Sequence, residues 1–181
     1  MSNYNLTWGA NTPAVQHKLS ELLLYVAEKA GDLSDFGSTK INKTLYHADM
    51  NFYREHGRSI TGAQYHRIQK GPVPKHILVV ERALSEAGAL ELVEDDMTHR
   101  RIAKRPADIS TFTDEEITTV DKEIQRLAQM TAGQVSDDSH DIRWRALTHQ
   151  DLVPYEFAFL NSEVTDADKK DAATLADRFG W

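Results

Sequence analysis

Apolar side chains recur at intervals of three and four along much of the chain, which predicts amphipathic helices. The first such stripe runs from Pro13 to Gly31; Thr12 can cap its start, and Gly31 follows its last apolar residue. A second stripe, Ser38–Gly57, spaces its apolar residues four, three and four apart. Because the loop between them is short, we expect the two helices to pack as an antiparallel pair or a corner.

The middle of the chain predicts β-structure around a third helix. Ala63–Gln69 predicts a short strand that Lys70–Pro74 interrupts, and the last proline of that segment can open a helix that ends at Gly88. Ala89–Glu94 and His99–Lys104 flank a polar turn, which predicts a β-hairpin. A helix followed by a hairpin is also the outline of a winged helix, so that interpretation remains open.

The last third of the chain returns to helical spacing. Thr113–Glu116 has the sequence of a capping box, and it opens a fourth predicted helix that extends up to Gly133. A polar turn is expected at Ser136–Asp141, before an apolar and aromatic segment at Leu152–Leu160. The spacing predicts a terminal helix at Thr165–Phe179.

These elements predict a mainly α fold with a small antiparallel β element (class α+β), formed by one short strand and one hairpin. We find no internal repeat, low-complexity linker or proline-rich break, and 181 residues suit one domain. We therefore expect a single domain over 1–181, with a core from about 12 to 162 and a C-terminal helix at 165–179.

Composition narrows the chemistry. The chain has no cysteine, which excludes disulfides, Cys-based metal sites and thiol nucleophiles. Met1–Asn11 lacks the basic start and apolar core of a secretory leader, and no apolar run approaches the ~20 residues that span a bilayer. We therefore expect a cytoplasmic protein that does not enter the membrane.

The net charge of -7 is unevenly distributed. Residues 1–90 hold 10 Lys/Arg and 8 Asp/Glu, whereas residues 91–181 hold 11 and 20. Within the first half, Ser38–His76 carries 7 basic residues against 2 acidic ones. Such a stretch can mark an anion or nucleic-acid site, and it is where we first look for a partner. Mutual neutralisation of the two halves is the simpler interpretation, which we favour.

The densest polar stretch is Lys40–Asp49, where Asp49 has aromatic neighbours at helical spacing. A buried carboxylate needs a partner, and Arg58 is the nearest cation beyond the helix end. The pair could belong to a binding site or could anchor the turn Gly57–Gly62; we favour the anchor. His47 and Asp49, two residues apart on a helix, should point to different sides.

Enzyme and metal patterns are weak. No two histidines lie at the helical spacing of a zinc site, and the chain lacks the Gly-x-Ser-x-Gly elbow. The glycines fit neither the dinucleotide-binding nor the P-loop pattern. We therefore expect no cofactor, no metal and no catalytic residues.

Five segments in order resemble the signature of the Panacea domain, the SocA-like family of antitoxins and phage-associated proteins: Lys40–Asp49, Gly57–Gly62, Gly71–Pro74, Ser139–His140 followed by Trp144, and Pro154–Glu156. The resemblance extends from about Val15 to Leu160. Thr44 and His47 depart from it, because more apolar residues are expected there, as does the Gln69-Lys70 lead-in to Gly71.

The resemblance implies a mainly helical fold with a small sheet and the role of antitoxin in a toxin–antitoxin pair. The implied partner is a cognate toxin encoded nearby, which most family members neutralise by direct contact. At least one member resembles instead a protease adaptor that delivers its toxin for degradation. Some members carry an extra DNA-binding domain; with only about 12 residues before the first predicted helix, we expect the minimal domain here.

From the resemblance we expect a set of residues that contact the partner or support the motif: Lys40, Asn42, Lys43, Tyr46, Asp49, Arg58, Ser59, Thr61, Tyr65, Pro72, Pro74, His140, Trp144 and Tyr155. Seven of them are expected to form one polar cluster: Lys40, Asn42, Lys43, Asp49, Arg58, Ser59 and Thr61. A winged-helix nucleic-acid binder is the second hypothesis, which the net charge of -7 disfavours. An enzyme is the third, and the oligomeric state, including a homo-oligomer, is left open.

Overall fold

The computed structural model describes residues 6–31, 33–94 and 99–160. Within these residues lie six α-helices: α1 (Pro13–Lys29), α2 (Ser38–His56), α3 (Ile77–Glu86), α4 (Asp114–Ala128), α5 (Ala132–Asp138) and α6 (Ile142–Arg145). The strands are β1 (Tyr65–Ile68), β2 (Gly71–Pro74), β3 (Leu90–Glu94), β4 (His99–Ala103) and β5 (Leu152–Val153). Two short 3-10 helices are η1 (Ile109–Thr111) and η2 (Tyr155–Phe159). The predicted class, mainly helical α+β, is confirmed.

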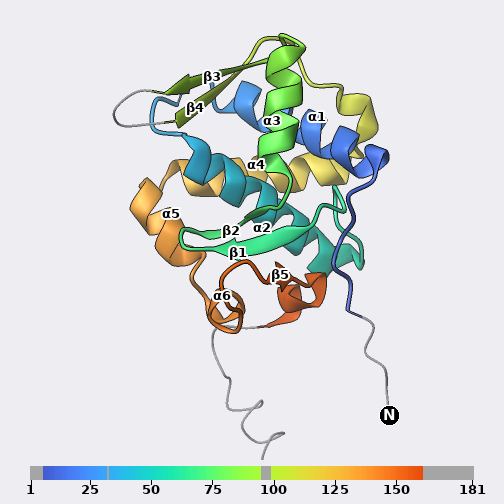
Figure 1. The fold of residues 1–181 in the computed structure, drawn as a ribbon, viewed down its shortest axis with the longest axis vertical. Helices are drawn as coiled ribbons and strands as arrows, with labels where there is room; N and C mark the ends of the chain where they lie inside the picture. Colours follow the sequence, from blue (N-terminus) through green and yellow to red (C-terminus); the bar gives the residue numbers. More distant parts are fainter. Residues whose placement is uncertain (1–5, 32, 95–98, 161–181) are drawn as a thin grey trace, which may run out of the picture.

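Helix α2 lies in the middle of the molecule, between the β1–β2 hairpin and α4 (Figure 1). Its buried side chains occupy successive positions through most of its length, from Lys40 to Phe52. A helix that is buried on most sides is part of the core rather than a surface layer. Gly57 ends it with a φ of 71°, a left-handed conformation that glycine adopts without a steric penalty.

Two small antiparallel sheets flank the helices. The first has the strand order β2-β1-β5, with Tyr65 opposite Pro74 on one side and Val153 on the other. The second is the β3–β4 hairpin, with Leu90 opposite Ala103. This hairpin and the end of α3 that leads into it lie at the opposite end of the molecule from β5 and α6 (Figure 1).

The hairpin β1–β2 corrects the prediction that Lys70–Pro74 only interrupts a strand. Proline has no backbone N–H, but β2 is an edge strand, where Pro72 and Pro74 are tolerated. Because Pro74 belongs to β2, the third helix begins later than predicted, at Ile77.

The fourth helix is shorter than predicted and a further helix follows it. α4 opens with the predicted capping box between Thr113 and Glu116 but ends at Ala128, before Gly133. A second capping box, formed by Thr131 and Gln134, opens α5, which takes up the first residues of the predicted polar turn. The predicted terminal helix at 165–179 lies outside the described residues. None of the described helices is long and apolar enough to cross a membrane.

Candidate functional site

Asp49 of α2 is fully buried and accepts hydrogen bonds from three other segments. The backbone N–H of Thr61 donates to Oδ1 over 2.8 Å, and the Thr61 hydroxyl donates to Oδ2. The hydroxyl of Tyr65 on β1 lies 2.8 Å from Oδ2, and that of Tyr155 on η2 lies 3.3 Å from it. These four residues, called here the Asp49 network, connect α2 with the Gly57–Gly62 turn, β1 and η2.

Each tyrosine of the Asp49 network has one hydroxyl hydrogen and two acceptors in reach. The second acceptor is the carbonyl of Leu45, 2.9 Å from Tyr65, and the carbonyl of Ala63, 2.7 Å from Tyr155. Each tyrosine therefore shares its hydroxyl hydrogen between Asp49 and a backbone carbonyl. Burial raises the pKa of Asp49, against the hydrogen bonds that lower it. The Asp49 network thus gives a buried carboxyl group four donors, which offset part of the cost of its burial.

Arg58 is not the partner of Asp49, which corrects the predicted ion pair. Its guanidinium bonds Glu116 of α4 over 2.5 Å and lies over the ring of Phe52, 4.9 Å from the centroid. Glu116 also accepts from Lys18 at 3.0 Å. Burial acts to raise the pKa of Glu116, but hydrogen bonds from Arg58, Lys18 and a backbone N–H hold it below its usual value. The turn is thus anchored by Asp49 through Thr61, while Arg58 connects the end of α2 to α4.

Lys43 is a buried amine beside the glycine of β2. Its side chain is 1% exposed, and its Nζ donates to the carbonyl of Pro72 over 2.7 Å. Burial lowers the pKa of Lys43 to about 7. Gly71 has a φ of +94°, and a Cβ there would lie 2.1 Å from the Ser139 hydroxyl and 2.8 Å from the Lys43 Nζ. The motif therefore needs glycine at this position, because any side chain would collide with both groups.

Lys40 is also buried, and its Nζ bonds Asp35 over 2.7 Å. The basic stretch of the sequence is consequently only in part a surface feature: Lys40 and Lys43 lie in the interior, whereas four of its seven basic residues are exposed, namely Arg54, Arg58, Lys70 and Lys75. The expected single polar cluster is wrong as well. Its members have separate partners: Lys40 bonds Asp35, Lys43 bonds Pro72, Arg58 bonds Glu116, and Thr61 bonds Asp49.

Trp144 and His140 cover the strand β1. Their rings stack with centroids 4.0 Å apart, and the indole Nε1 donates to the carbonyl of Ile68 over 2.9 Å. The guanidinium of Arg67 lies 3.8 Å from the Trp144 ring centroid, a cation–π distance. These contacts hold the α5–α6 connection against the first sheet.

The remaining predicted residues lie around these contacts. The Tyr46 ring is buried edge-on against Tyr65, with centroids 5.4 Å apart. Neither the Tyr46 hydroxyl nor the Asn42 Oδ1 has a hydrogen-bond partner in the described parts of the chain. Ser59 is half-buried in the turn before Thr61.

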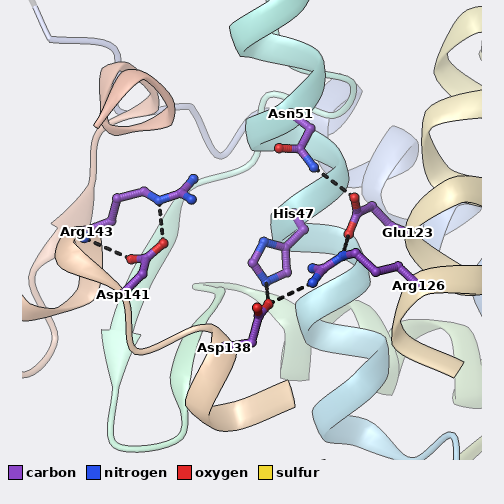
Figure 2. Close-up of a pocket in the computed structure, with 7 residues that line it drawn as sticks. All are labelled: His47, Asn51, Glu123, Arg126, Asp138, Asp141 and Arg143. Carbon is purple, nitrogen blue, oxygen red and sulfur yellow. Dashed lines mark hydrogen bonds and ion pairs between the residues drawn. The ribbon is translucent and has the colours of Figure 1, made fainter. Parts of the chain in front are cut away.

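A polar pocket of 280 Å³, which the sequence did not reveal, lies between α2, α4, α5 and the start of α6 (Figure 2). Seven side chains line it: His47, Asn51, Glu123, Arg126, Asp138, Asp141 and Arg143. Arg126 bonds Glu123 and Asp138, each over 2.9 Å, and Arg143 bonds Asp141 over 2.6 Å. Each carboxylate in the pocket therefore has a guanidinium partner.

His47 projects into this pocket (Figure 2). Asp49 on the same helix bonds Thr61 and Tyr65 instead, so the two side chains point to different sides, as predicted. Its Nε2 lies 3.6 Å from Asp138, too far for a hydrogen bond. Burial, assisted by the charges of Arg126, Arg143 and Lys43, lowers the pKa of His47 well below its usual value. The imidazole is therefore neutral near pH 7, so the pocket holds ion pairs of α4, α5 and α6 around a neutral ring. No group of three metal-binding side chains occurs in the described ranges.

The family model for the SocA-like antitoxin, Panacea domain, matches residues 41–145, more than half of the chain. The chain belongs to this family. The matched Panacea region runs from α2 to α6 and contains most of the buried polar contacts described above, including Asp49 with Thr61 and Tyr65. Neither the curated proteins nor the solved structures include a match to the chain.

Proposed function

We propose that this protein is the antitoxin of a toxin–antitoxin pair and neutralises a toxin encoded nearby by direct protein contact in the cytoplasm. Membership of the SocA-like Panacea family, over residues 41–145, is the observation that carries the proposal. In this proposal the protein acts without catalysis, and the toxin is its partner.

Because the motif residues are buried, we propose that they stabilise the fold while other, exposed residues contact the toxin. Asp49, Thr61, Tyr65 and Lys43 are all buried, so they stabilise the scaffold and are unavailable to a partner. Contact with the toxin must then come from exposed side chains outside this set. Such a design lets one scaffold present different surfaces to different toxins.

Co-expression tests the proposal directly. The neighbouring gene product expressed alone should stop growth, and this protein should restore it while forming a complex of the two purified chains. Growth arrest that persists despite co-expression of the folded protein would refute the antitoxin role. If the half-life of the toxin shortens on co-expression, and growth is restored only when the host protease is active, the protein delivers the toxin for degradation. Direct neutralisation would then be the wrong mechanism.

A nucleic-acid binder is the second candidate, because the order α3, β3, β4 is that of a winged helix. The net charge of -7 opposes long-range attraction to phosphates. Retention of duplex DNA at low ionic strength that declines as salt rises would favour this candidate. We expect no retention.

A further inference from the structure

Helix α3 exposes two large apolar side chains that the core does not use. The helical spacing predicts that Ile77, Val80, Leu84 and Ala87 face inward; the first three are buried, whereas Ala87, at the end of the helix, is exposed. Leu78 and Val79 lie outside that stripe, with 71% and 58% of their surface exposed. Folding of this helix therefore does not account for them.

A third exposed apolar residue lies across a groove from α3. Leu92 of β3 is 42% exposed, and both Leu78 and Leu92 line a groove of 280 Å³ between α3 and the β3–β4 hairpin. The buried carboxylate of Glu81 lines the groove too and is neutralised by Arg101 of β4, whose Nη2 lies 2.7 Å away. Large exposed apolar side chains beside a groove are typical of a protein interaction site. We call Leu78, Val79 and Leu92 the α3–β3 face.

Basic side chains around this face indicate the charge of its partner. Arg82 lies one helical turn after Leu78 and Val79, and Lys75 lies two residues before the helix; both are exposed. Arg100 and His99 line the groove from β4, and the two acidic residues of the lining face basic side chains: Glu81 pairs with Arg101, and Glu94 lies 3.6 Å from His99. The face is thus apolar with cations around its α3 side, in a chain whose net charge is -7. A complementary surface would carry large apolar side chains flanked by carboxylates.

We propose that the α3–β3 face binds the toxin, through a segment of the toxin that presents apolar residues flanked by Asp or Glu. This inference rests on the proposed antitoxin function and adds to it the surface and the chemistry of the contact. A second copy of this chain fits less well, because it would bring the same cations to the face. The exposed α3–β3 face includes none of the buried residues of the Asp49 network, so the network and the toxin contact are separate.

The test compares two matched substitutions of exposed apolar residues. Leu78→Lys places a charge in the α3–β3 face, whereas Ile109→Lys places it on η1, where Ile109 is 59% exposed. Both variants and the wild type are assayed for growth rescue against the neighbouring gene product and for affinity to the purified toxin. Circular dichroism melts confirm that each variant is folded. Arg82→Glu, measured at low and high salt, tests the charge component.

Leu78→Lys should weaken toxin binding about 30-fold or more, the effect of a central interface residue, and abolish rescue. Ile109→Lys should remain within about threefold of wild type, and Arg82→Glu should slow association at low salt only. If Leu78→Lys restores growth and binds the toxin as well as the wild type does, the α3–β3 face is not the toxin-binding surface, while the antitoxin function stands. A wild type that does not bind the toxin overturns both proposals. The wild type could instead form a dimer that Leu78→Lys converts to a monomer, with no change in toxin affinity. That result would identify the face as a homodimer interface and overturn the inference.

Discussion

Replacing Lys43 with methionine should make the stability of this protein less dependent on pH. The pKa of Lys43 is lowered from 10.5 to about 7 by burial, a difference worth about 5 kcal/mol at 1.36 kcal/mol per pKa unit. The unfolded chain keeps the lysine proton up to about pH 10.5, whereas the folded chain releases it near pH 7. Between these values the unfolded state binds one more proton, so the free energy of unfolding rises with pH.

Urea unfolding followed by circular dichroism at pH 6, 7, 8 and 9 measures the effect. The free energy of unfolding of the wild type, relative to Lys43→Met, should rise by about 2 kcal/mol from pH 7 to pH 9. Other titrating groups are shared by the two proteins and cancel in the difference. Lys75→Met, at an exposed lysine, is the control for the loss of one charge, and its difference from wild type should stay nearly constant.

A constant difference between the wild type and Lys43→Met across this pH range would refute the reasoning. It would mean that the ammonium keeps its proton in the folded state, either because water reaches it or because it has a stronger partner than the Pro72 carbonyl. The crystal structure of the protein at pH 6 and at pH 9 would then distinguish these two explanations.

Three further predictions concern other buried groups. Asp49→Asn should lower the free energy of unfolding by about 1–2 kcal/mol, because the amide keeps an oxygen that can accept from the Thr61 N–H, whereas Asp49→Ala removes every acceptor and should cost about 3 kcal/mol or more; equal losses in urea unfolding would contradict the role of Asp49 as an acceptor. Gly71→Ala should lower the melting temperature, because its Cβ would lie 2.1 Å from the Ser139 hydroxyl, and Ser139→Gly should restore part of the loss. His47 should stay neutral when folded, so stability should fall by up to about 1.4 kcal/mol per pH unit below pH 6.5, and a His47→Gln variant with the same acid sensitivity as wild type would exclude this cause.

The sequence predicts the features that local spacing determines. The apolar stripes before Gly31 and Gly57, the capping box of Thr113 and the β3–β4 hairpin all depend on residues within a few positions of one another, and the structure has each of them. The hairpin β1–β2 was missed because proline usually excludes a strand, and only the sheet order shows that β2 is an edge.

The partners of the polar residues could not be predicted in the same way. Asp49 and Tyr155 are 106 residues apart, and nothing in the spacing of either indicates the other. Charged residues are usually exposed, so the spacing does not indicate that Lys40 and Lys43 are buried, with Asp35 and the Pro72 carbonyl as their partners. Leu78 and Val79 were not noticed because they stand inside the continuous apolar run Ile77–Val80, where the inward and outward positions look alike.

The reach of the Asp49 network has a consequence for synthesis on the ribosome. Helix α2 emerges early, but the Tyr155 hydroxyl that contacts Asp49 is made 106 residues later. Until then the Asp49 carboxyl group lacks one of the hydrogen-bond donors that it has in the folded protein. Contacts between residues this distant in sequence also form slowly. The packed state should therefore appear late in translation and in one cooperative step, and a nascent chain stalled before residue 155 should remain sensitive to protease around α2.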